Sequence, residues 1–135
     1  MAGDKHQFMI GLIVRKMRED GVNIFGIDGN YPGLFGRKIS MPPQILRHRP
    51  DIIGIKKEQI CLGEAKTDSD LGNPRMYEQL RDFTSVRLNG MNCAVYYGIP
   101  ESCRAKFDST LKRTGLAEIT NIQILYIPNE LLDGK

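Results

Sequence analysis

The feature that most constrains this fold is a pair of apolar runs separated by a short polar turn. The runs lie between Asp51 and Lys66, and the dipeptide Lys57-Glu58 separates them. Two apolar runs around a two-residue turn are typical of an antiparallel β-hairpin. With Lys57-Glu58 as the turn, the pairing places Asp51 opposite Glu64.

This pairing brings like charges together at the end of the hairpin. Facing residues lie roughly 4.5–5.5 Å apart at Cβ, and like charges at that separation repel. A divalent cation is the usual reason for two carboxylates to lie side by side. Lys66 follows Glu64 by two residues, so strand alternation returns its side chain to the same face. We therefore expect Asp51, Glu64 and Lys66 to converge on one metal site.

The residue types at this point favour magnesium chemistry. Mg²⁺ takes hard oxygen ligands, typically one or two carboxylates with waters and a substrate phosphate. Asp51 and Glu64 offer the carboxylates, and the backbone carbonyl of Ala65 is a candidate third ligand. In such a site the metal polarises a phosphate and activates a bound water. Lys66 is expected to stabilise developing charge or to hold that water. The expected cofactor is Mg²⁺ or Mn²⁺.

The rest of the chain predicts helices and strands around this hairpin. Helices are expected over residues 4–20, 74–88 and 100–114, with Asn89-Gly90 ending the second. Further strands are expected over residues 22–27, 92–99 and 122–127. This order indicates an α/β fold, with a mixed sheet that carries helices on its faces, in one domain spanning residues 1–135.

A long irregular loop is expected over residues 28–49, because this segment is rich in glycine and proline early on. Loops of this length in compact domains are usually functional or mobile. The loop carries much of the basic charge of a chain whose net charge is only +3. A solvated surface and a contact with DNA phosphates both account for that charge. The candidate DNA contacts are Arg37, Lys38, Arg47, His48 and Arg49.

The cysteines and the apolar runs indicate the compartment. Cys61, Cys93 and Cys103 show no paired spacing and no zinc motif. The N-terminus lacks a signal-peptide pattern, and no apolar run approaches the length of a membrane span. We expect an intracellular protein that does not enter a membrane.

The hairpin also resembles a known signature. Pro50-Asp51, twelve intervening residues and then Glu64-Ala65-Lys66 resemble the motif of the PD-(D/E)XK phosphodiesterase superfamily, which has the restriction-endonuclease-like fold. That core is a helix, three strands, a helix and a further strand, which matches the order expected over about residues 5–99. The resemblance implies a metal-dependent DNA endonuclease, similar to Holliday-junction resolvases and restriction enzymes. It implies that Asp51 and Glu64 bind the metal and that Lys66 assists the attacking water.

Two further features are interpreted through this resemblance. In some branches a glutamine on the helix after the Glu-x-Lys strand contributes to the site, and Gln79 is the candidate here. Many members carry a glutamate on the first helix, but residues 8–14 contain no acid. His6 or Gln7 is a candidate substitute, through contact with a metal-bound water, although His6 more often is only a polar residue of a first helical turn. A chain this small presents one active site, so cutting both strands would suggest a symmetric homodimer, the commonest closed oligomer.

A different function remains open at this point. The chain is alternatively a catalytically inactive nucleic-acid-binding or structural domain that retains the nuclease fold. Under that interpretation the basic loop matters, and the charges at the strand ends form an ordinary salt-bridge network. Nucleic-acid binding would then survive removal of metal, and Lys66 would add little to affinity.

Overall fold

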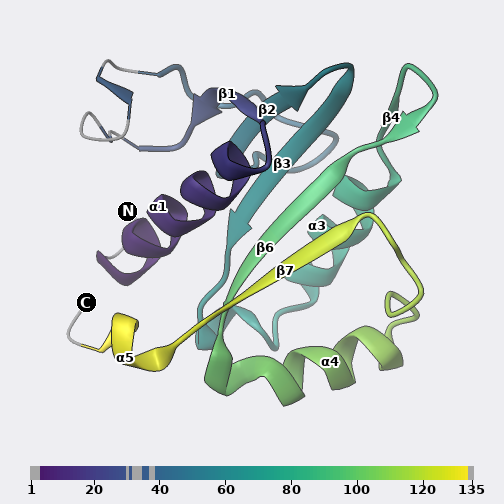
Figure 1. The fold of residues 1–135 in the computed structure, drawn as a ribbon. Helices are drawn as coiled ribbons and strands as arrows, with labels where there is room; N and C mark the ends of the chain where they lie inside the picture. Colours follow the sequence, from purple (N-terminus) through teal and green to yellow (C-terminus); the bar gives the residue numbers. More distant parts are fainter. Residues whose placement is uncertain (1–3, 30, 32–34, 37–38, 134–135) are drawn as a thin grey trace.

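The computed structural model describes residues 4–29, 31, 35–36 and 39–133, and it shows an α/β fold built on a mixed sheet (Figure 1). Five strands form this sheet in the order β1-β2-β3-β6-β7. Their bounds are β1 Asn23–Ile27, β2 Ile52–Lys56, β3 Gln59–Ala65, β6 Ala94–Pro100 and β7 Ile122–Ile127. The pairs β1-β2 and β2-β3 are antiparallel, whereas β3-β6 and β6-β7 are parallel. The expected arrangement of a mixed sheet with helices on its faces is confirmed.

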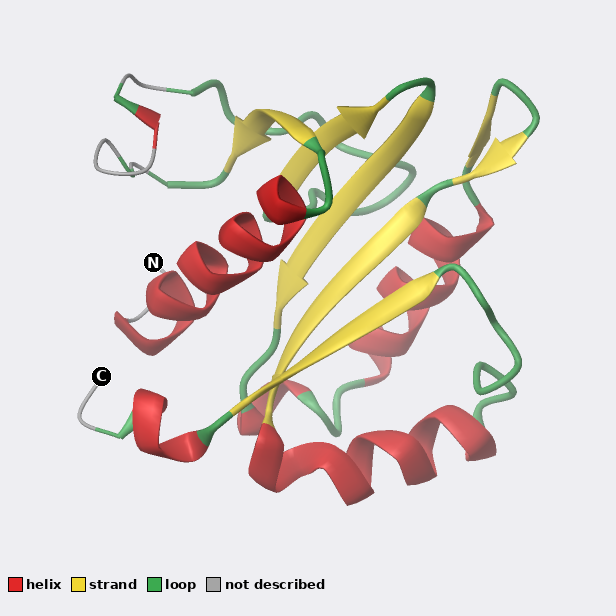
Figure 2. Ribbon diagram, in the orientation of Figure 1, coloured by secondary structure: helices red, strands yellow, loops and turns green. Residues whose placement is uncertain are grey.

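Helices cover both faces of the sheet (Figure 2). The longer helices are α1 Asp4–Glu19, α3 Pro74–Ser85 and α4 Arg104–Arg113. The short ones are η1 Asp68–Asp70, η2 Glu101–Cys103 and α5 Asn129–Leu132. Helix α1 packs on the face that carries Ile52 and Ala65, and α3 and α4 pack on the face that carries Ile53 and Leu62. Within the described residues, no helix has both the length and the apolarity needed to cross a bilayer.

Glycines line the α1 face of the sheet where the helix crosses it. A Cβ built on Gly98 would lie 2.7 Å from Ile13 Cδ1, and one built on Gly63 would lie 3.1 Å from Met17 Sδ. Such separations are shorter than ordinary van der Waals contact between carbon atoms. The glycines therefore allow α1 to lie directly against β3 and β6.

The hairpin register is the one that the turn position predicted. Ile52 pairs with Gly63, and Lys56 pairs with Gln59, so Lys57-Glu58 forms the turn. Lys57 has a φ of 56°, a left-handed conformation that tight hairpin turns require. This register fixes which side chains share a face at the far end of the hairpin.

The end of the second helix differs from the prediction. Helix α3 ends at Ser85, and the chain then forms a small hairpin from β4 Arg87–Leu88 and β5 Met91–Asn92. Asn89 and Gly90 have φ values of 54° and 78°. Two consecutive left-handed residues favour a hairpin turn, which is the commonest use of an Asn-Gly pair. The dipeptide therefore joins two strands instead of ending a helix.

The described part of the long loop returns to the sheet and leads into β2. The amide of Ile27 donates to Ser40 O at 2.9 Å, and the amide of Asp28 donates to Asp51 O at 2.8 Å. Farther along, Ile45 and His48 form an isolated antiparallel bridge around a tight turn. Arg37 and Lys38, two of the predicted DNA contacts, lie outside the described residues.

Candidate active site

The three side chains expected at the end of the hairpin lie together. Asp51 directly precedes β2, Glu64 lies in β3, and Lys66 directly follows that strand. The two acids are 8% and 2% exposed. Lys66 Nζ lies 3.3 Å from Glu64 Oε2. Two carboxylates and one ammonium group therefore share a buried position where β3 ends.

Each acid accepts a hydrogen bond from a backbone amide that belongs to the other acid or to its neighbour in the chain. The amide of Asp51 donates to Glu64 Oε1 at 2.9 Å. The amide of Ala65, the neighbour of Glu64, donates to Asp51 Oδ2, also at 2.9 Å. The second oxygen of Glu64 faces Lys66. These reciprocal hydrogen bonds hold both carboxylates against the end of the hairpin.

Burial and the neighbouring Asp51 make it unfavourable for Glu64 to be ionised. Burial raises the pKa of Glu64 well above its usual range, Asp51 raises it further, and Lys66 opposes the rise. Burial and the same two acids also raise the pKa of Tyr97, which neighbours Glu64 across the β3-β6 pair. A bound cation would relieve this repulsion, because it favours the ionised carboxylates.

Helix α1 contributes a histidine from its first turn. His6 Nε2 lies 3.4 Å from Asp51 Oδ2. The hydrogen bond to Asp51 raises the pKa of His6, although partial burial opposes the rise. His6 Nδ1 is buried and has no hydrogen-bond partner in the described part of the chain. The structure therefore brings His6, not an acid of α1, to the position that sequence reasoning left open.

Gln79 lies on α3 beside these groups. Its Oε1 accepts a hydrogen bond from Tyr97 Oη at 3.2 Å. A cavity of about 220 Å³ opens between the end of β3 and the start of α3. Its lining residues are Lys66, Asp70, Asn73, Arg75, Met76 and Gln79. Gln79 and Lys66 therefore face one cavity, although they are far apart in the sequence.

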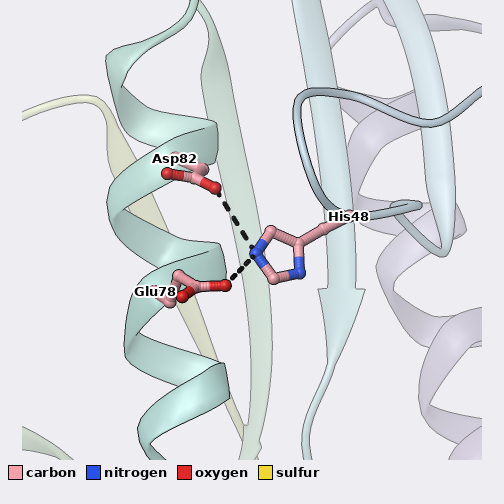
Figure 3. Close-up of side chains that lie close together, drawn as sticks. All are labelled: His48, Glu78 and Asp82. Carbon is pink, nitrogen blue, oxygen red and sulfur yellow. Dashed lines mark ion pairs between the residues drawn. The ribbon is translucent and has the colours of Figure 1, made fainter.

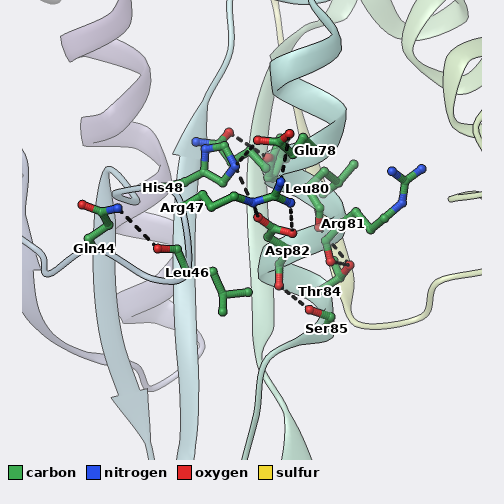
Figure 4. A network of polar contacts seen from close by, with 12 residues as sticks. Gln44, Leu46, Arg47, His48, Glu78, Leu80, Arg81, Asp82, Thr84 and Ser85 are labelled. Carbon is green, nitrogen blue, oxygen red and sulfur yellow. Dashed lines mark hydrogen bonds and ion pairs between the residues drawn. The ribbon is translucent and has the colours of Figure 1, made fainter.

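The described basic residues of the loop lie in different environments. Arg47 donates to both oxygens of Asp82, at 2.9 and 2.8 Å (Figure 4), and its side chain remains 62% exposed. Exposed Arg49 donates to Pro42 O at 2.7 Å. His48 is only 4% exposed, so in this conformation its ring has little surface to offer to a phosphate. DNA contact by Arg47 and Arg49 stays a prediction.

A second group of ionisable side chains lies between the loop and α3 (Figure 3). His48, Glu78 and Asp82 place one ligand atom each within 4.8 Å of one another. Across the described ranges, no other group of three or more His, Cys, Asp and Glu residues comes this close. Sequence reasoning missed it. Part of the signal was present, because acids four residues apart lie on one helix face.

Ionisable side chains gather at two places, the end of the hairpin and the junction of the loop with α3. Comparison with protein-family models, with curated proteins and with solved structures gave no match.

Proposed function

We propose that this chain is a Mg²⁺- or Mn²⁺-dependent endonuclease that hydrolyses DNA phosphodiester bonds. The observation that carries the proposal is the buried pair of Asp51 and Glu64, each of which accepts a hydrogen bond from a backbone amide, with Lys66 Nζ 3.3 Å from Glu64. Adjacent carboxylates can hold a metal that assists phosphodiester hydrolysis, and a neighbouring ammonium group can stabilise the charge that develops on the phosphate.

The donor set fits the proposed cofactor. Carboxylate oxygens from Asp51 and Glu64 are hard ligands of the kind that Mg²⁺ and Mn²⁺ prefer, and the Ala65 carbonyl is a candidate third. When bound, the ion polarises the phosphate and lowers the pKa of a coordinated water. The repulsion that raises the pKa of Glu64 supports the assignment, because a cation offsets it.

The remaining groups take roles that follow from their positions. Lys66 holds the attacking water or stabilises the charge that develops on the phosphate oxygens. Gln79 faces the same cavity as Lys66 and is placed to contact the substrate. His6 orients Asp51 from α1. Exposed Arg47 and Arg49 are the candidate contacts with the DNA backbone outside the site.

The order of elements supports a restriction-endonuclease-like core. Helix α1 precedes three antiparallel strands, α3 follows, and β6 then pairs in parallel with β3. Helix α4 and strand β7 extend this core. One chain carries one such site, so we propose that a homodimer is required for cutting both strands of a duplex.

A cleavage assay tests the proposal directly. Plasmid, single-stranded and branched DNA are incubated with the full chain and Mg²⁺ or Mn²⁺, with and without EDTA. We expect cleavage that EDTA abolishes. Asp51→Asn, Glu64→Gln and Lys66→Met should each lower the rate on the order of 100-fold or more while leaving DNA binding nearly intact. Asn and Gln are chosen because each keeps an acceptor oxygen for the neighbouring amide.

The matched control is Glu118→Gln, which removes an exposed acid far along the chain from the hairpin. This variant should cut at the parental rate. If the three site variants also cut at that rate, the site is wrongly assigned. DNA binding that is insensitive to EDTA, with no cleavage of any substrate, would instead identify an inactive binding domain that keeps the nuclease fold.

A further inference from the structure

The second ionisable group contains a buried nitrogen without a hydrogen bond. The side chain of His48 is 3% exposed, and its Nε2 has no hydrogen-bond partner in the part of the chain that the structure describes. Nε2 nevertheless points between two carboxylates of α3 (Figure 3). It lies 3.1 Å from Glu78 Oε1 and 3.4 Å from Asp82 Oδ2.

These separations match the edges of a metal coordination shell. Zinc–nitrogen and zinc–oxygen bonds are about 2.1 Å long. Two ligands at that distance lie roughly 3.4 Å apart at a tetrahedral angle and roughly 3.0 Å apart at a right angle. The distances from His48 Nε2 to Glu78 and Asp82 fall at these values. The ligand atoms of Glu78 and Asp82 lie within 4.8 Å of each other. A small side-chain movement that shortens this third separation would let one ion contact all three groups.

Arg47 contacts both acids of this cluster (Figure 4). Its guanidinium contacts Glu78 Oε2 at 3.2 Å and both oxygens of Asp82. Glu78 thus turns one oxygen to Arg47 and the other to His48. A cation bound beside His48 Nε2 would add to the compensation that Arg47 gives both carboxylates and that Arg81 gives Asp82.

We propose that His48, Glu78 and Asp82 form a second metal site that binds a zinc-type divalent ion. An imidazole nitrogen beside two carboxylates suits Zn²⁺ or Co²⁺ better than Mg²⁺, which prefers oxygen ligands. Three protein ligands leave one position open to water. The ion ties the loop to α3 three residues before Asp51, and so it steadies the segment that leads into the hairpin.

The experiment isolates this site from the catalytic one. The full chain carrying Asp51→Asn and Glu64→Gln is titrated with Co²⁺, whose visible absorption reports low coordination number, and with Zn²⁺ by calorimetry. We expect one ion per chain, displacement of Co²⁺ by Zn²⁺, and no displacement by excess Mg²⁺. Sulfur-to-cobalt absorption in the near ultraviolet should be absent, because Cys61, Cys93 and Cys103 lie outside the site.

Substitutions in that background identify the ligands. His48→Gln, Glu78→Gln and Asp82→Asn should each weaken binding by more than about tenfold, since even outer-shell changes cost that much. Glu118→Gln should bind as the background does. The Glu78 side chain is 42% exposed, so Glu78→Gln is expected to fold even if His48→Gln does not. Circular dichroism checks the fold of each variant.

Two results would overturn the proposal. One is the absence of stoichiometric Co²⁺ or Zn²⁺ uptake by the folded background variant. The other is uptake that folded Glu78→Gln and Asp82→Asn do not change, which would place the ion elsewhere.

Discussion

At the scale of single residues, the proposed metal site at the end of the hairpin has neighbours on both faces of the sheet. Lys66 and Gln79 line a cavity beside α3, whereas His6 reaches Asp51 from α1. The end of the sheet is where these two sides meet. His6 therefore acts on the same carboxylate that we assign to the metal, without lying on the hairpin.

His6→Gln should lower the proposed cleavage activity by about 10- to 100-fold, because partners that orient a metal ligand contribute about that much. The measurement is the cleavage rate as a function of Mn²⁺ concentration, and the half-saturating concentration should rise. Gln7→Ala changes the exposed neighbour on the same turn and serves as the control. A parental cleavage rate and an unchanged half-saturating Mn²⁺ concentration for His6→Gln would show that His6 has no part in the site.

The sequence could predict the relative positions of side chains only where a single local register fixes them. Asp51, Glu64 and Lys66 belong to a single hairpin, so the position of its turn decides their geometry. His6 is placed by the packing of α1, and His48 meets Glu78 and Asp82 through the path of the loop. Tertiary contacts between distant segments leave no local pattern, so these contacts were not predictable.

At the scale of elements, the hairpin is constrained by a close approach of backbone. A Cβ on Gly54 would lie 2.8 Å from Asn23 O and 3.1 Å from Ile24 Cα, both backbone atoms of β1. Backbone atoms in a central sheet cannot move aside as a flexible side chain can. Gly54 therefore sets how tightly β1 and β2 associate.

Gly54→Ala should destabilise the protein by about 1–3 kcal/mol, the usual cost of forcing extra atoms into a packed interior. The free energy of unfolding is measured by urea denaturation. Gly72→Ala is the matched control, because that glycine is exposed and an added Cβ would meet nothing within 4 Å. The control should change stability by less than about 0.5 kcal/mol. Similar losses in both variants would contradict the role given to Gly54.

The bounds of an element were predictable where the local sequence is compatible with only one conformation. Apolar alternation located β7 over Ile122–Ile127, which agrees with the structure. Asn89-Gly90 supports two conformations, a helix stop and a hairpin turn, and the sequence did not decide between them. The short exposed strands on either side contain too few residues to show a period.

At the scale of the whole molecule, tyrosines of two strands donate hydrogen bonds to carboxylates on the helical side of each face of the sheet. Tyr96 Oη donates to Asp20 Oδ2 at 2.8 Å, at the end of α1. Tyr126 Oη donates to Asp108 Oδ1 at 2.9 Å, on α4. Burial and these hydrogen bonds raise the pKa of Tyr96 and raise the pKa of Tyr126 to about 12.

This arrangement predicts loss of stability at alkaline pH. Each phenol has a higher pKa in the folded state than in the unfolded chain, where it is about 10. The stabilisation is therefore complete below about pH 10 and is lost as the pH rises toward the folded value. The free energy of unfolding is measured from about pH 9 to about pH 11. The double variant Tyr96→Phe, Tyr126→Phe should show a shallower decline, and an unchanged slope would contradict this account.

The overall architecture was predictable because the hydrophobic pattern and the order of elements agree. Apolar periodicity located the helix over residues 4–20, and α1 packs on one face of the sheet through that apolar side. The route of the loop over residues 39–50 was not predictable, because it depends on single contacts such as the bond between Ile27 and Ser40.

The two hydrogen bonds from backbone amides to Asp51 and Glu64 also bear on how this sequence can evolve. Each carboxylate accepts a hydrogen bond from a backbone amide at the end of the other strand, so each helps to hold the two strands together. Descendants freed from selection for chemistry would still need acceptor oxygens at both positions. Such lineages should therefore drift toward Asn and Gln there before they accept an apolar side chain.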